Sequence, residues 1–510
     1  MWGSMIRSIL WFIGLAVIGT SAVRGQTLPG QEPDSVAAPP RDTLHLTLDE
    51  ALAMAATQSV DALVAKDEMR SAYWTYRNYK ADLLPSLTFS GTLPSLNKSL
   101  SSYQKEDGSY EFIPSRSLSE YAGLSLSQNI PYTGGKISIQ SQLQRLDQLD
   151  GSDKTNWLSV PAVITLEQPL ITARPLHWSM KIEPERYKEA TQQFFVDMET
   201  VSLQTIQHYF NLLLSVANRE IAEQTLKNAT QLYDIAQGKK RLGLISDNDL
   251  LQLKLGKLNA EAGIVTANQD YEQKVYALRN YLGITGDLWI EAEVPDAAPV
   301  YPVTLDEVRE LARVNNPITY NTRRRLLEAR QIIAQARANR GFQVDVYASI
   351  GFTGSNTKFA PSYRNLQDRQ VASLGVTIPI LDWGKGKGRV QVAKSQAEVT
   401  RHQVQQDNMD FEETIALAVQ RYQDQAALTE LYRSADTVAQ RRYRTAFETF
   451  VMGQINVLDI NAAQTEENTA KRNYINQLYY SWLYLYNLRQ ITLYDFGTRS
   501  HIVYDFLLDL

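Results

Sequence analysis

The stretch Thr47-Leu48-Asp49-Glu50 decides the fold, because it recurs 257 residues later as Thr304-Leu305-Asp306-Glu307. A second pair of landmarks repeats at a different spacing. Glu167-Gln168-Pro169-Leu170-Ile171 matches Thr377-Ile378-Pro379-Ile380-Leu381, 210 residues later. A duplicated unit of about 200 residues predicts a pseudo-symmetric architecture.

The spacing of 210 residues then continues without a gap toward the end of each half. Gly243 pairs with Gly453 and Asp249 with Asp459 at this spacing. The two spacings differ by 47 residues, so the first half carries an insertion of that length between Glu50 and Pro169.

Each half is predicted to run helix, strand, returning strand, very long helix, turn and long helix. The first helices are expected at 49–84 and 306–339, and strand alternation follows each of them. The very long helices are expected at about 184–242 and 389–452, roughly 90 Å each at 1.5 Å per residue. Their polar composition favours coiled-coil packing over a membrane span.

The insertion is predicted to form an extra β-hairpin at about 119–146, around Gly134-Gly135. The first half then has about four strands and the second about two. Small polar residues alternate with apolar ones, which suits a wall with lipid on one side and water on the other. An exposed sheet of a soluble domain is the alternative.

The N-terminus has Arg7, an apolar run from Ile9 to Ile18 and then small residues, which predicts a signal peptide over 1–25. A flexible leader is expected over 26–44. No later segment reaches 18 apolar residues, so an exported chain is expected to be either soluble or a membrane β-barrel.

Composition excludes several functions. The net charge of -5 argues against a nucleic-acid partner. The chain has no cysteine, which removes disulfides and thiolate catalysis. Its five histidines are scattered without metal-ligand spacing. We therefore expect no enzyme activity, no catalytic residue, no metal site and no cofactor.

Four motifs then carry a family resemblance: Leu48–Leu52, Gln168–Leu170, Pro379–Gly384 and Gly453–Asp459. With their order in both halves, residues 45–495 resemble the TolC family of outer-membrane efflux proteins. The resemblance implies an α+β membrane protein, a homotrimer whose β-barrel lies in the lipid of the cell outer membrane. A long α-helical coiled-coil barrel continues it through the periplasm.

The same resemblance implies a function. The chain is expected to be the exit duct of a tripartite multidrug efflux or type I secretion system, a passive channel across periplasm and outer membrane. Its partners would be a periplasmic adaptor protein and an inner-membrane transporter. The alternative is a secreted periplasmic coiled-coil adaptor or scaffold without a pore. The sequence does not identify the cargo.

The expected organisation follows from the duplication and the resemblance. The first structural repeat spans 45–285, an equatorial linker spans 286–303, and the second repeat spans 304–495. The C-terminal tail, 496–510, has no assigned role. The family contributes four strands per chain, whereas six are counted here. The extra hairpin therefore either widens the barrel to eighteen strands or folds outside the wall or into the lumen.

By resemblance, the turns at Gly243 and Gly453 form the periplasmic tip of the duct. Asp459, its mate Asp249 and the aromatic Phe450 are expected at the pore constriction. Three Asp459 carboxylates around a narrow axis would bind cations. Both acids also have the spacing of helix caps, with Ser246 and Asn456 as partners, so capping alone is the alternative. Adaptor contact is expected at Leu242, Gly243, Leu244, Met452, Gly453 and Gln454.

Overall fold

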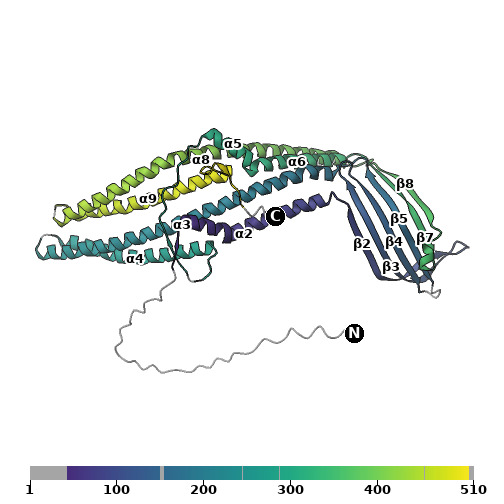
Figure 1. Ribbon diagram of the computed structural model, residues 1–510, viewed down its shortest axis with the longest axis horizontal. Helices are drawn as coiled ribbons and strands as arrows, with labels where there is room; N and C mark the ends of the chain where they lie inside the picture. The colour runs from purple at the N-terminus through teal and green to yellow at the C-terminus, as the bar shows by residue number, and fades with distance from the viewer. Residues whose placement is uncertain (1–42, 150–153, 244, 287, 453, 505–510) are drawn as a thin grey trace, which may run out of the picture. The chain divides into compact units, whose positions relative to one another are not determined.

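Six antiparallel strands form the main sheet of the computed structural model, which describes residues 43–149, 154–243, 245–286, 288–452 and 454–504. Figure 1 shows these strands side by side, in the order β2-β3-β4-β5-β7-β8. The expected signal peptide, most of the leader, and residues 505–510 lie outside the described residues. The strands are β2 (Ser86–Gln104), β3 (Tyr110–Ile130), β4 (Gly135–Gln148), β5 (Thr155–Pro169), β7 (Gln343–Asn356) and β8 (Gln367–Thr377).

The expected hairpin at 119–146 lies inside this sheet. Its residues belong to β3 and β4, which pair with each other through a turn in which Gly134 has a φ of +77°. Glycine adopts this conformation without steric cost. Because β3 also pairs with β2 and β4 also pairs with β5, the hairpin is part of the wall of strands in this chain.

Nine helices are described, and Figure 1 shows the longest of them extending away from the sheet. The two longest, α3 and α8, have 67 residues each, or about 100 Å at the usual rise. The helices are α1 (Leu48–Gln58), α2 (Val60–Ala81), α3 (Pro175–Arg241), α4 (Asp247–Tyr281), α5 (Leu305–Asn315), α6 (Pro317–Ala338), α7 (Phe359–Ser362), α8 (Lys385–Val451) and α9 (Val457–Thr492).

Several helix boundaries differ from those expected. The first helix of each half is broken in two, because Ser59 and Asn316 take extended conformations and their side chains cap α2 and α6. Pro317 strengthens the second break, since it has no N–H to donate and suits a first helical turn. In α3, the helix begins at Pro175 for the same reason, and Pro184 lies inside it.

The main core lies among α1, α2, α3 and α4 of the first half, with Leu478 of α9 packed against them. Strands β1 (Thr43–Leu46) and β6 (Trp289–Ala292) pair in parallel and pack on α3. Tyr209 of α3 is fully buried, and its hydroxyl lies 2.8 Å from the carbonyl of Leu46 and 2.7 Å from that of Glu293. A second core cluster joins α5, α8 and α9. Two short strands, β9 (Tyr494–Asp495) and β10 (Ser500–His501), follow α9.

Candidate functional site

One face of the six-stranded sheet is apolar and exposed. The strand register aligns one large apolar side chain from each of five neighbouring strands in a single row. Their exposed fractions run from 41% to 65%. The row consists of Leu87, Leu126, Ile139, Ile164 and Ile350.

The opposite face is polar and partly buried. The adjacent row carries hydroxyl side chains on β2, β3, β4, β5 and β7 and ends at Val371 of β8. Ser86 and Ser127 in this row lie within hydrogen-bond distance at 2.9 Å. Three of the hydroxyl residues are 5% to 7% exposed, although water-soluble proteins usually bury apolar side chains and expose polar ones. The hydroxyl residues of the row are Ser86, Ser127, Ser138, Thr165 and Ser349.

The sheet has two open edges, β2 and β8. With six strands in antiparallel order, these two edge strands run in opposite directions. An edge strand presents unpaired N–H and C=O groups that can pair with another chain. The two edges are therefore able to pair with each other between copies in the same antiparallel pattern.

The ends of the four long helices pack around a small apolar cluster of their own, at the helix ends away from the sheet in Figure 1. Phe450 belongs to this cluster and is only 5% exposed. Its backbone carbonyl accepts a hydrogen bond from Lys239 at 3.2 Å, and the same ammonium lies 4.8 Å from its ring centre. The side chain expected at the constriction is thus packed within its own chain.

Asp249 and Asp459 lie in the first turns of α4 and α9. Asp249 forms a reciprocal cap: its carboxylate accepts from the Ser246 hydroxyl at 2.7 Å and from the Ser246 N–H. These bonds hold the pKa of Asp249 below its usual value. Asp459 donates its N–H to the Asn456 side chain at 2.9 Å, and its own side chain is exposed. The expected capping contact is confirmed at both helices.

The residues expected at the adaptor surface lie at the two turns. Leu242 is 74% exposed and Met452 65% exposed, and Gln454 is exposed as well. Gly243 has a φ of +71°, the left-handed conformation common at helix ends. Leu244 and Gly453 lie outside the described residues. The tip therefore presents apolar side chains from both halves.

A buried charge network was missed by sequence reasoning. Glu199 of α3 is fully buried and accepts hydrogen bonds from Arg489 of α9 at 3.2 and 3.3 Å and from the Tyr504 hydroxyl at 3.0 Å. Arg489 also contacts Asp495 at 3.1 Å. Burial raises the pKa of Glu199 against the opposing effect of Arg489. The sequence signal available was the pair Leu278-Arg279, which recurs 210 residues later as Leu488-Arg489.

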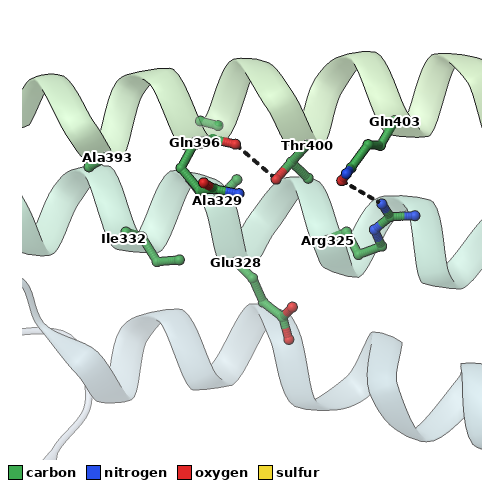
Figure 2. Close-up of a pocket in the computed structure, with 9 residues that line it drawn as sticks. Arg325, Glu328, Ala329, Ile332, Ala393, Gln396, Thr400 and Gln403 are labelled. Carbon is green, nitrogen blue, oxygen red and sulfur yellow. Dashed lines mark hydrogen bonds between the residues drawn. The ribbon is translucent and has the colours of Figure 1, made fainter.

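Figure 2 shows a groove between α6 and α8. Arg325 reaches across it to Gln403 at 3.4 Å and to Asp407 at 2.5 Å. Glu328 turns away toward α3, where it accepts a hydrogen bond from Arg186 at 2.8 Å. Alanines on both helices let them approach closely. The groove is a seam between packed helices.

Two kinds of site are absent from the described part of the chain. Within it, no helix combines the length and the apolar composition that a membrane span requires. Among the same residues, no three His, Asp or Glu side chains lie close enough together to hold a metal ion.

Comparison with known proteins identifies relatives of this chain. The model of the family described as outer membrane efflux protein matches residues 51–284 and 308–492. The cation efflux system protein CusC of Escherichia coli strain K12 is 26% identical over 287 residues, 53% of this chain. That alignment spans 60% of CusC, so the match covers little more than half of the curated relative.

Solved structures show the same fold at lower identity. A CusC crystal structure has a TM-score of 0.60 and 16% identity, covering 90% of this chain and 98% of CusC. The Campylobacter jejuni CmeC outer membrane channel has a TM-score of 0.64 and 15% identity, covering 91% of this chain and 88% of CmeC.

Fold and comparison together define the class: an α+β protein with one six-stranded sheet and long helices, the fold seen in outer-membrane channels. The family match extends over most of the sequence. The chain belongs to the outer membrane efflux protein family, and its location is the outer membrane, extending into the periplasm. The named relatives are channels and efflux proteins rather than enzymes.

Proposed function

We propose that three copies of this chain form one duct through the outer membrane and periplasm, with no catalytic role. The observation that carries the proposal is the inverted sheet, with apolar side chains exposed and hydroxyls buried. Exposed apolar residues on one face suit lipid, and the hydroxyl face suits a water-filled lumen. A periplasmic scaffold without a pore would not require a sheet with an exposed apolar face.

Closure of the sheet requires more than one chain. Open sheet edges are not tolerated in lipid, where no water satisfies their N–H and C=O groups. Six strands from each of three chains make a barrel of eighteen, with β8 of one copy paired to β2 of the next. Barrels of 16–18 strands leave an aqueous channel. We therefore favour the wider barrel over a hairpin displaced from the wall.

The matching lengths of the helices support an internal duplication. Helices α3 and α8 have 67 residues each, and α4 and α9 have 35 and 36. We propose that 45–285 and 304–495 are two copies of one unit joined by the linker 286–303. The two repeats of each of three chains then supply similar sets of helices, which form a ring beneath the barrel.

The duct serves as the exit passage of a tripartite efflux or type I secretion system. Its partners in this proposal are a periplasmic adaptor protein and an inner-membrane transporter. The exposed Leu242 and Met452, with Gly243 and Gln454 beside them, support adaptor contact at the tip. Apolar side chains at the end of polar helices leave surface that a partner can cover.

The constriction is proposed at the same tip, at Asp459, Asp249 and Phe450. Asp459 is exposed, lines the same groove as Arg441 and Arg442, and is free to face a neighbouring copy. Asp249 is held by its cap, and Phe450 positions the turn by packing within the tip. Asp459 is thus the acid best placed to select cations, since a ring of carboxylates favours cation passage.

Cysteine crosslinking tests the closure of the trimer, because the natural chain contains no cysteine. Ser90→Cys in β2 is combined in turn with Arg369→Cys, Val371→Cys or Ser373→Cys in β8. Oxidation links cysteines only where their Cα atoms lie within about 7 Å. We expect one combination to give covalent dimers and trimers and nothing larger.

Ser90→Cys with Ser141→Cys is the matched control, since β4 is paired on both sides within the chain. This pair should give no link between chains. Absence of a link in every β2–β8 combination, or ladders that extend beyond three chains, would contradict the closed trimer.

A further inference from the structure

Two positive charges lie directly opposite each other where the β2–β3 hairpin extends past the end of β4. Lys98 of β2 is in register with Arg116 of β3, and both residues are exposed. Residues opposite each other in an antiparallel pair have Cβ atoms about 4.5–5.5 Å apart, and like charges at this separation destabilise the pair. An anion bound between the two side chains of this cation pair would remove the repulsion.

The acids on the same face of the sheet are paired elsewhere or distant. Glu120 of β3 and Asp147 of β4 both lie within ion-pair distance of Arg145, at 3.7 and 2.9 Å. Asp368 lies on β8, at the other edge of the sheet. Among the described residues, no carboxylate forms an ion pair with either member of the cation pair. Its positive charge is therefore available to a ligand.

Apolar side chains flank the cation pair on both sides. On the same face, Leu96 and Leu118 precede it on the side of the helices, and Leu100 and Pro114 follow it toward the hairpin turn. Leu96 and Leu100 are both exposed. A small free anion would leave these side chains in water, whereas the acyl chains of a lipid would cover them. The arrangement therefore suits an anionic lipid.

The position of the cation pair along the sheet suits the boundary of a membrane. Arg116 lies ten residues along β3 from Leu126 of the apolar row, on the side away from the helices. Ten residues extend about 34 Å along a strand. At a tilt of about 45° this length crosses about 24 Å of membrane, and the apolar band of outer-membrane barrels is about 25 Å tall. The cation pair is then level with the headgroups of the outer leaflet.

We propose that Lys98 and Arg116 bind the phosphate groups of a lipid in the outer leaflet, whose acyl chains cover the apolar side chains on the same face. The inference rests on the proposed duct, which places the sheet in lipid. The planar guanidinium of Arg116 matches a phosphate with two parallel hydrogen bonds, and Lys98 adds a compact charge. Both side chains come from one chain, so each copy in a trimer carries its own site.

Native mass spectrometry of the purified full chain in detergent tests the proposal, with diphosphoryl lipid A as the probe and fully dephosphorylated lipid A as the comparison. We expect the phosphorylated form to bind more tightly. The double variant Lys98→Gln, Arg116→Gln should weaken its binding about tenfold to thirtyfold, because two basic side chains at a lipid surface are lost. Lys98→Arg should retain binding, since the charge is kept.

Lys105→Gln is the matched control, because Lys105 belongs to the same hairpin and its charge is paired with Glu111 at 2.9 Å. This variant should bind diphosphoryl lipid A as the natural chain does. Equal binding of the two forms of lipid A, or unchanged affinity in the double variant, would overturn the proposal. Displacement of lipid A by excess inorganic phosphate would overturn it as well, because the site would then be one for a free anion.

The lipid site and the duct fail in different ways. A chain that conducts in bilayers but does not distinguish the two forms of lipid A contradicts the lipid site alone. A chain that binds diphosphoryl lipid A through the cation pair but never conducts contradicts the duct alone.

Discussion

Two residues that occupy matching positions in the two halves are held differently. Asp249 shares a reciprocal cap with Ser246, whereas Asp459 relies on the Asn456 side chain to cap its N–H. The sequence spacing predicted a cap at both places, because a cap depends on residue types three positions apart. Which of the two carboxylates is itself bonded depends on side-chain rotamers, which spacing alone does not determine.

The bonded carboxylate makes the start of α4 sensitive to acid. The pKa of Asp249 is lowered in the folded chain by bonds from Ser246. The contribution of Asp249 to the stability of the folded chain is therefore complete above the unfolded pKa near 3.8. This contribution is lost as pH falls through the lower folded pKa. Hydrogen exchange in the first turn of α4 should accelerate over this acid range.

Asp249→Asn should remove that pH dependence, and Asp459→Asn is the matched variant at the start of α9. Equal acid sensitivity of α4 in the natural chain and in Asp249→Asn would show that the Asp249 carboxylate is not its source.

Strand and helix types were predictable from the sequence at the scale of elements, and several boundaries were not. The alternation in β2 and the hairpin at 119–146 predicted strands because a sheet with different environments on its two faces needs that period. The breaks at Ser59 and Asn316 were missed, because a single capping side chain ends a helix without disturbing its apolar pattern. The expected start of α3 near Pro184 was wrong for a related reason: proline position alone does not distinguish a helix start from a tolerated interior site.

The junction of β5 and β7 depends on one glycine. A Cβ on Gly351 would lie 2.4 Å from the Ala162 carbonyl oxygen, where β5 carries a bulge. Gly351→Ala should thus destabilise the sheet by about 1–3 kcal/mol through overpacking. Its thermal unfolding in detergent should begin at a lower temperature than that of the natural protein.

Gly375→Ala is the control for this substitution, since a Cβ there meets the Asp345 carbonyl oxygen at an ordinary 3.7 Å. Similar unfolding temperatures for the two variants would show that the bulge does not constrain Gly351.

At the scale of the whole molecule, the two halves and the C-terminal segment are joined through Glu199. Tyr504, in the tail that the sequence left unassigned, donates to this buried carboxylate. Hydrogen bonds to charged groups contribute about 1.5–3 kcal/mol, so Tyr504→Phe should lower the free energy of unfolding by that order. Denaturant titration measures the loss, with Tyr132→Phe as an exposed control. Equal free energies of unfolding for Tyr504→Phe and Tyr132→Phe would show that the tail does not stabilise the fold through Glu199.

Single-channel conductance in planar bilayers tests the duct most directly, on the purified full chain after its mass is confirmed as a trimer. We expect discrete conductance steps that prefer cations, and Asp459→Ala should bring the cation preference close to that of free solution. A stable trimer that never conducts would contradict the duct, provided that the double variant Asp459→Ala, Phe450→Ala is silent as well.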